Sequence, residues 1–116
     1  MKRILAIVPD LLIEVQIEGA AKRLNAVVET VSVQEAPELI ASTRPELVIV
    51  DLATPGLEVE AITSAALEAQ VPVAGFYPHV EDKLRRAAKE AGIEHVYARS
   101  RFLRELPVIL EERLKG

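Results

Sequence analysis

The sequence predicts an α/β fold, a doubly wound parallel sheet of five strands with helices on both faces. Two observations predict it. Short apolar runs rich in β-branched residues alternate five times with stretches in which apolar residues recur at helical spacing. The links between these stretches are short, and strict alternation of strand and helix is typical of parallel sheets covered on both sides.

The five expected strands are the apolar runs. They cover residues 3–8, 27–33, 47–50, 71–76 and 93–98. The third run, which reads LVIV, is uninterrupted, as in strands that are buried on both faces of a parallel sheet. The second run contains Glu29, Thr30 and Ser32, so we expect it to be less buried.

The expected helices follow the strands. They cover residues 11–24, 34–43, 57–70, 80–91 and a last segment that begins near Ser100 as its N-cap. Gly92 ends the fourth helix, whose inner face should include Val80 and Leu84. In the last helix, Pro107 should produce a kink or a restart, and Phe102 and Val108 could be left on the outer face.

Composition narrows the classes of function. We expect residues 1–116 to form one domain, without a linker or a low-complexity segment. The absence of cysteine excludes disulfides, thiolate zinc sites and cysteine nucleophiles. A net charge of −4 argues against non-specific nucleic-acid binding. No apolar run approaches the roughly 20 residues that span a bilayer. We therefore expect a cytoplasmic protein that binds neither nucleic acid nor membrane.

The candidate site is at the carboxyl ends of the strands, where open α/β sheets bind their ligands. Asp51 directly follows the most apolar strand and precedes the turn Thr54-Pro55-Gly56. Asp10 follows the first strand, and two neighbouring acids repel each other unless a cation lies between them, so Mg²⁺ is the expected ligand. Each acid also has a structural alternative: Asp10 as a helix N-cap, which we favour, and Asp51 as an Asx-type turn.

Other residues offer little catalytic chemistry. No glycine-rich phosphate-binding motif occurs, and Ser64 has no evident base. The two histidines, His79 and His95, are far apart, and His95 should lie at the opposite edge of the sheet.

Three segments resemble the receiver domain of two-component response regulators, and the resemblance extends over essentially the whole chain. They read RPELVIVDLATPG, VPVAGFYPH and KEAGIEHVYARS. The resemblance implies the strand order 2-1-3-4-5. It also implies that Asp51 is the phosphoacceptor, that Asp10 binds Mg²⁺, and that Ala53 offers its backbone carbonyl to the metal.

The sequence departs from the receiver pattern at the residues that support the chemistry. Pro9 replaces one member of the usual acidic pair, and Tyr77 stands where the family has Thr or Ser. Arg99 and Ser100 replace a Lys followed by a Pro in a cis bond, so this turn should differ. The small residue after the Thr or Ser is Pro78 here, and Val59 replaces a usual Gly.

These departures predict a degenerate receiver, or pseudo-receiver, which stands alone and signals through protein contacts. The expected partner is a histidine kinase or a downstream effector, with a homodimer through the last two helices and the fifth strand as a further expectation. Tyr77 would be a rotamer switch or a rim aromatic, and an ion pair between Asp51 and Arg99 would fix one permanent state. The alternative is a small flavodoxin-like ligand-binding protein or enzyme that uses the same edge of the sheet.

Overall fold

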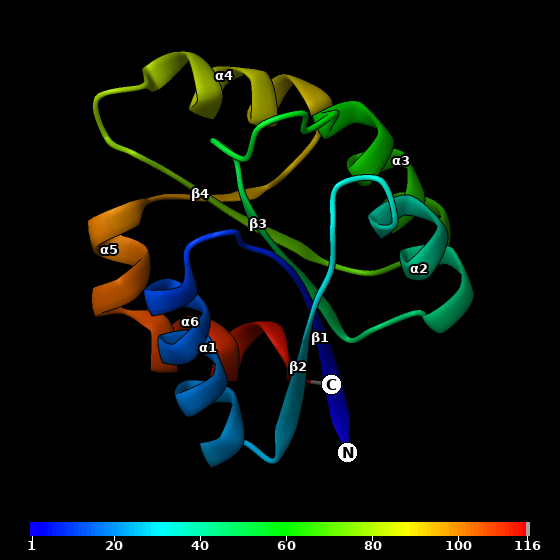
Figure 1. Ribbon diagram of the computed structural model, residues 1–116, viewed down its shortest axis with the longest axis vertical. Coiled ribbons are helices and arrows are strands. Elements are labelled where there is room, and N and C mark those ends of the chain that lie inside the picture. Colours follow the sequence, from blue (N-terminus) through cyan, green and yellow to red (C-terminus); the bar gives the residue numbers. More distant parts are fainter. Residues whose placement is uncertain (116) are drawn as a thin grey trace.

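The computed structural model describes residues 1–115 and confirms the predicted fold class. Five parallel strands form one sheet in the order β2-β1-β3-β4-β5, and helices connect them (Figure 1). The strands are β1 (Lys2–Ile7), β2 (Ala26–Thr30), β3 (Leu47–Asp51), β4 (Val73–Tyr77) and β5 (His95–Ala98). The helices are α1 (Leu11–Arg23), α2 (Ala36–Thr43), α3 (Val59–Ala69), α4 (Asp82–Ala91), α5 (Arg99–Arg104) and α6 (Leu106–Arg113).

The sheet separates two apolar cores. Helices α1, α5 and α6 cover one face, and α2, α3 and α4 cover the other (Figure 1). Strand β3 is buried along its whole length, as its uninterrupted apolar run predicts. Because side chains alternate along a strand, Leu47 and Ile49 pack into the first core while Val48 and Val50 pack into the second. This burial fixes the backbone that ends at Asp51.

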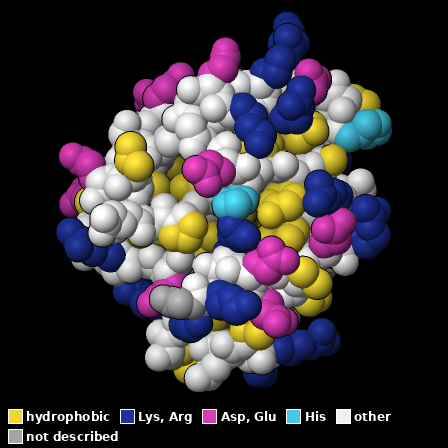
Figure 2. All heavy atoms as spheres, turned by 180° about the vertical axis from the view of Figure 1, so that it is seen from behind, with side chains coloured by type: hydrophobic (Ala, Val, Ile, Leu, Met, Phe, Trp, Pro, Cys, Tyr) yellow, Lys and Arg dark blue, Asp and Glu magenta, His cyan; other side chains and the backbone are white. Residues whose placement is uncertain are grey.

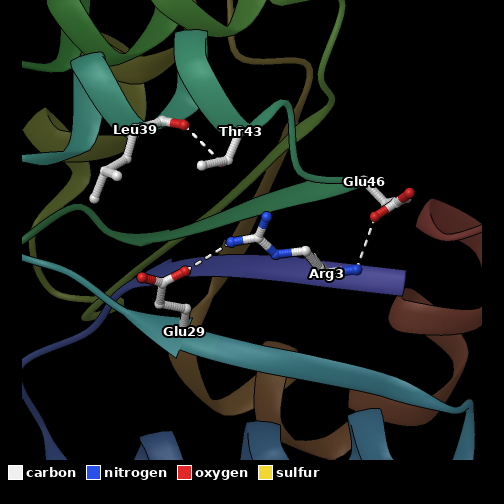
Figure 3. Close-up of polar contacts among 5 residues, drawn as sticks. All are labelled: Arg3, Glu29, Leu39, Thr43 and Glu46. Carbon is white, nitrogen blue, oxygen red and sulfur yellow. Dashed lines mark hydrogen bonds and ion pairs between the residues drawn. The ribbon is translucent and has the colours of Figure 1, made fainter. Parts of the chain in front are cut away.

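The edge strand β2 is less buried, as predicted, with Glu29 and Thr30 exposed. Figure 3 shows how Arg3 of β1 connects this edge to the centre of the sheet. Its guanidinium pairs with Glu29 at 2.9 Å, and its backbone N–H donates to the carboxylate of Glu46 at 2.7 Å. Both side chains of the ion pair are about half exposed, so the pair contributes at most about 1 kcal/mol to stability.

Helix α4 begins later than predicted. The prediction that Val80 faces the core is wrong, because Val80 lies in a turn closed by a hydrogen bond from the Glu81 N–H to the Pro78 carbonyl, and 79% of it is exposed. The helix starts at Asp82, whose carboxylate pairs with Arg85 at 2.8 Å. Its end at Gly92 agrees with the prediction, because this residue adopts a φ of 106° that favours glycine.

The last helical segment consists of two short helices. Helix α5 follows β5 without a loop, so Ala98 rather than the predicted Ser100 is its N-cap. Pro107 lies in the first turn of α6, which agrees with the predicted restart. Val108 is 55% exposed, as expected, whereas Phe102 is fully buried. Its predicted outer position is wrong because the early start of α5 turns its ring onto Phe76.

No helix within residues 1–115 has both the length and the apolar character needed to cross a membrane.

Candidate functional site

Asp51 lies at the carboxyl end of β3, between β1 and β4. It is only 8% exposed and is the one buried charged or polar residue within 1–115. Its carboxylate Oδ1 accepts a hydrogen bond from the Ala53 N–H at 2.9 Å. Its backbone carbonyl accepts bonds from the Thr54 N–H at 3.0 Å and from the Thr54 hydroxyl at 2.6 Å. The side chain therefore forms the Asx-type turn that the sequence offered as the structural alternative.

The environment of Asp51 disfavours its charge. Burial raises the pKa of the Asp51 carboxyl, and the negative charges of Asp10 and Glu81 raise it further. The hydrogen bond from Ala53 and the positive charge of Arg99 act against this rise in pKa without cancelling it. A carboxylate in this state gains from a proton or from an additional cation.

Asp10 lies at the same edge of the sheet, where it is the N-cap of α1. Its Oδ1 accepts hydrogen bonds from the Leu12 N–H at 2.9 Å and from the Ile13 N–H at 3.2 Å. These bonds satisfy two of the free donors at the start of the helix, which confirms the predicted N-cap. The structure therefore brings Asp10 near Asp51 while using its carboxylate for a structural purpose.

Substitution of Asp10 tests the cap. We expect Asp10→Ala to lower the free energy of unfolding by about 1 kcal/mol, because the amides of Leu12 and Ile13 lose their acceptor. The measurement is urea unfolding followed by circular dichroism. Asp10→Asn is the matched control, since it removes the charge and keeps an acceptor oxygen. An equal loss in both variants would contradict the cap as the source of the effect.

Arg99 is the first residue of α5, and its side chain is exposed. Within residues 1–115, no ion pair joins it to Asp51, although its charge lowers the pKa of the Asp51 carboxyl from a distance. The hypothesis of a direct Asp51–Arg99 pair is therefore wrong for this structure. The physical reason is that Asp51 is buried and held by Ala53, while Arg99 extends into solvent.

Tyr77 ends β4 and is half-buried. It packs against the core that α2, α3 and α4 cover, as Leu84 also does. The side chain is thus part of the apolar rim above the second core, as one of the two sequence interpretations expected.

The predicted magnesium ligands were Asp10, Asp51 and the carbonyl of Ala53. Mg²⁺ requires near-octahedral oxygen coordination and is usually held by carboxylates together with water. In both acids, Oδ1 already accepts backbone hydrogen bonds. In the part of the chain that the structure describes, no three His, Cys, Asp or Glu side chains lie close enough to hold a metal ion. Asp10, Asp51 and the Ala53 carbonyl would therefore supply at most three of the six ligands of a Mg²⁺ ion, and water would have to complete its coordination.

Glu81 is the residue near this site that the sequence did not indicate. Its negative charge raises the pKa of Asp51 from the loop between β4 and α4. The expected helix over residues 80–91 placed Glu81 on a solvated helical face. The signal that was available is Pro78, which ends the strand and favours a turn before the helix.

Comparison with known proteins was made by sequence and by structure. No protein-family model and no curated protein matches the sequence. The structure matches a response regulator from Hahella chejuensis with a TM-score of 0.84 and 20% identity, covering 99% of this chain and 96% of that one. It matches a response regulator from Thermotoga maritima with a TM-score of 0.79 and 16% identity, over 100% and 99% of the two chains.

A third match carries a metal. The receiver domain of the sensor histidine kinase PA1611 from Pseudomonas aeruginosa, described with a magnesium ion in its active site cleft, has a TM-score of 0.81 and 19% identity. The alignment covers 99% of this chain and 98% of that one. At these identities the similarity establishes the fold alone, and the chemistry of the site has to be argued from the residues of this chain. The chain has the fold of response-regulator receiver domains.

Proposed function

We propose that this protein is a pseudo-receiver, a signalling module of receiver fold that acts through protein contacts and does not need phosphorylation. The observation that carries the proposal is the state of the Asp51 carboxylate. It is buried, it accepts a backbone hydrogen bond within its own turn, and two further acids raise its pKa. Receiver chemistry would instead need a metal ion and a cation placed to receive the phosphoryl charge.

The electrostatics of the site support this proposal. A phosphoryl group on Asp51 would replace the single negative charge of the carboxylate by about two, near Asp10 and Glu81. The nearest compensating side chain is Arg99, which is exposed and makes no ion pair with Asp51 in the described chain. Tyr77 packs into the rim in place of the Thr or Ser hydroxyl of the family.

The contact surface in this proposal includes α4, β5, α5 and α6. Helix α4 carries the exposed cations Lys83, Arg86 and Lys89 and the exposed acids Asp82 and Glu90, and Arg86 pairs with Asp82 at 3.2 Å. A complementary protein surface would therefore carry charges of both signs. A histidine kinase or a downstream effector is the proposed partner, and a homodimer through the same elements is the alternative within this proposal.

The second candidate is a phosphorylated receiver with Asp51 as the phosphoacceptor. The observation that favours it is the position of Asp51 at the end of β3 in a receiver fold. Mg²⁺ with beryllium fluoride, which mimics a phosphoryl group on aspartate, separates the two candidates.

The test is a set of ¹H–¹⁵N NMR spectra recorded without addition, with Mg²⁺ alone, and with Mg²⁺ and beryllium fluoride. We expect the amide signals of Ala53 and Thr54, which lie within the Asp51 turn, to stay in place. Asp51→Asn is the control for non-specific binding. Shifts of these signals in the wild type that are absent in Asp51→Asn would overturn the pseudo-receiver proposal and assign Asp51 as the phosphoacceptor.

A further inference from the structure

Two adjoining hollows open at the amino ends of the strands, at the edge of the sheet opposite Asp51. The first has a volume of about 230 Å³ and lies between the ends of α3 and α4 and the starts of β4 and β5. Its wall is mostly apolar and includes Ala66, Leu67 and Ile93. The second has a volume of about 290 Å³, and both hollows share Val71 and Pro72 as a common wall. The two hollows adjoin at these residues, and we call the pair the amino-edge site.

The second hollow is cationic. Arg44, Arg113 and Lys115 line it, from the ends of α2 and α6, and Glu46 is the one acid among its lining residues. The carboxylate of Glu46 already accepts a hydrogen bond from the backbone of Arg3 at 2.7 Å (Figure 3). Glu112 pairs with Arg113 at 3.4 Å but is largely exposed. The hollow therefore has an excess of positive charge.

His95 and Arg113 connect the two hollows. His95 lines the apolar hollow, Arg113 lines the cationic one, and the Arg113 Nη1 group is hydrogen-bonded to His95 Nε2. Figure 2 shows one face of the molecule, on which hydrophobic, basic, acidic and histidine side chains lie next to one another near the centre. The Arg113 Nε atom is buried and has no hydrogen-bond partner among residues 1–115. Buried donors without a partner are rare because each one loses the hydrogen bond that it makes with water in the unfolded chain.

We propose that the amino-edge site binds a small organic acid with an aliphatic body. The body would occupy the apolar hollow, and the carboxylate would lie against Arg113 and the neighbouring cations. Two features point to this ligand class: the apolar wall of the first hollow and the cationic wall of the second, which adjoins it. Small-molecule sites usually combine an apolar surface with a few charged groups in this way. The proposal does not depend on phosphorylation or on any role of Asp51.

The test uses octanoate, kept below its micellar concentration, in an NMR titration of the whole chain. We expect saturable shifts of the amide signals of Leu67, Val73 and Gly92, which surround the apolar hollow. Acetate lacks the aliphatic body and 1-octanol lacks the charge, so each should bind at least about tenfold more weakly. Binding of 1-octanol as tight as that of octanoate would overturn the proposal, as would shifts confined to the Asp51 turn or the absence of saturable shifts.

Substitutions of the cationic residues test which of them contact the carboxylate of octanoate. Arg44 and Lys115 are both exposed, so Arg44→Gln combined with Lys115→Gln should leave the fold intact and weaken octanoate binding about tenfold. Arg113→Gln should weaken it further, and its amide spectrum reports whether the contact with His95 still holds the fold. The matched control is Arg23→Gln, which removes an exposed cation at the end of α1, outside both hollows. Equal affinity in the double variant and in the control would contradict the cationic wall as the carboxylate site.

Discussion

Phe102→Ala is expected to lower the free energy of unfolding by about 3–5 kcal/mol, the range for truncation of a fully buried aromatic side chain. Phe102 is 0% exposed, and its ring stacks on Phe76 with centroids 4.7 Å apart. Tyr97 packs against the same ring at 6.1 Å. The chain contains only two Phe residues, and both meet at this point between the sheet and α5. Loss of the Phe102 ring would leave a cavity next to Phe76 that the small aliphatic residues nearby cannot fill.

The measurement is urea unfolding at neutral pH. Val108→Ala on α6 is the matched control, because Val108 is 55% exposed and its truncation should change the free energy of unfolding by no more than about 0.5 kcal/mol. Phe102→Leu should lower the free energy of unfolding less than Phe102→Ala does, since leucine keeps most of the apolar volume. If Phe102→Ala lowered the free energy of unfolding as little as Val108→Ala, the Phe102 ring would lie outside the core, as the sequence alone suggested.

The error over Phe102 shows where sequence patterns stop being informative. The helical spacing of Leu103, Leu106, Leu110 and Leu114 predicts an apolar line; the last three are buried, and Leu103 is partly buried against the same core. A helical period, however, relates residues only within one continuous helix. The helix is interrupted at Glu105, between α5 and α6. The spacing of apolar residues in α6 therefore does not determine the direction of Phe102 in α5.

Strand patterns and local contacts were predictable for a different reason. The uninterrupted run that became β3 needs burial on both faces, and only the centre of a covered parallel sheet provides it. The cap by Asp10 and the turn at Asp51 join residues two or three positions apart, so backbone geometry alone determines them. The distance between Asp51 and Arg99 depends on side-chain reach across the sheet, which the sequence does not encode locally.

Asp51→Asn is expected to raise the free energy of unfolding at pH 7 by about 1–2 kcal/mol, the usual size of a penalty for burying a poorly compensated polar group. Burial, together with Asp10 and Glu81, raises the pKa of Asp51 in the folded protein above its ordinary value of 3.8. A carboxylate of the unfolded chain is ionised and solvated at pH 7, whereas in the folded state burial makes the ionised form of Asp51 less favourable. The Asn side chain has no charge to desolvate and keeps an oxygen that accepts the Ala53 N–H bond.

The sign of the pH dependence follows from this raised pKa. As the pH falls through the folded-state pKa, the folded protein takes up a proton before the unfolded chain does, so the penalty of the wild type diminishes. Once the pH is below the unfolded value near 3.8, the penalty is absent and the two proteins should differ little in stability. The advantage of Asp51→Asn should therefore be largest at neutral pH and shrink steadily toward pH 4. Urea unfolding of both proteins across this range measures it.

Asp82→Asn is the matched control, and its expected effect on the free energy of unfolding is opposite to that of Asp51→Asn. The hydrogen bond from Arg85 lowers the pKa of Asp82, so its ionised form stabilises the folded state. That stability is present above the unfolded pKa and is lost as the pH falls through the folded one, so Asp82→Asn should be destabilising at pH 7 and nearly neutral in acid. If Asp51→Asn also destabilised the protein at pH 7, the Asp51 carboxylate would be stabilised by a cation. Repeating the measurement with EDTA would then distinguish a bound metal ion, whose contribution disappears, from Arg99, whose contribution stays.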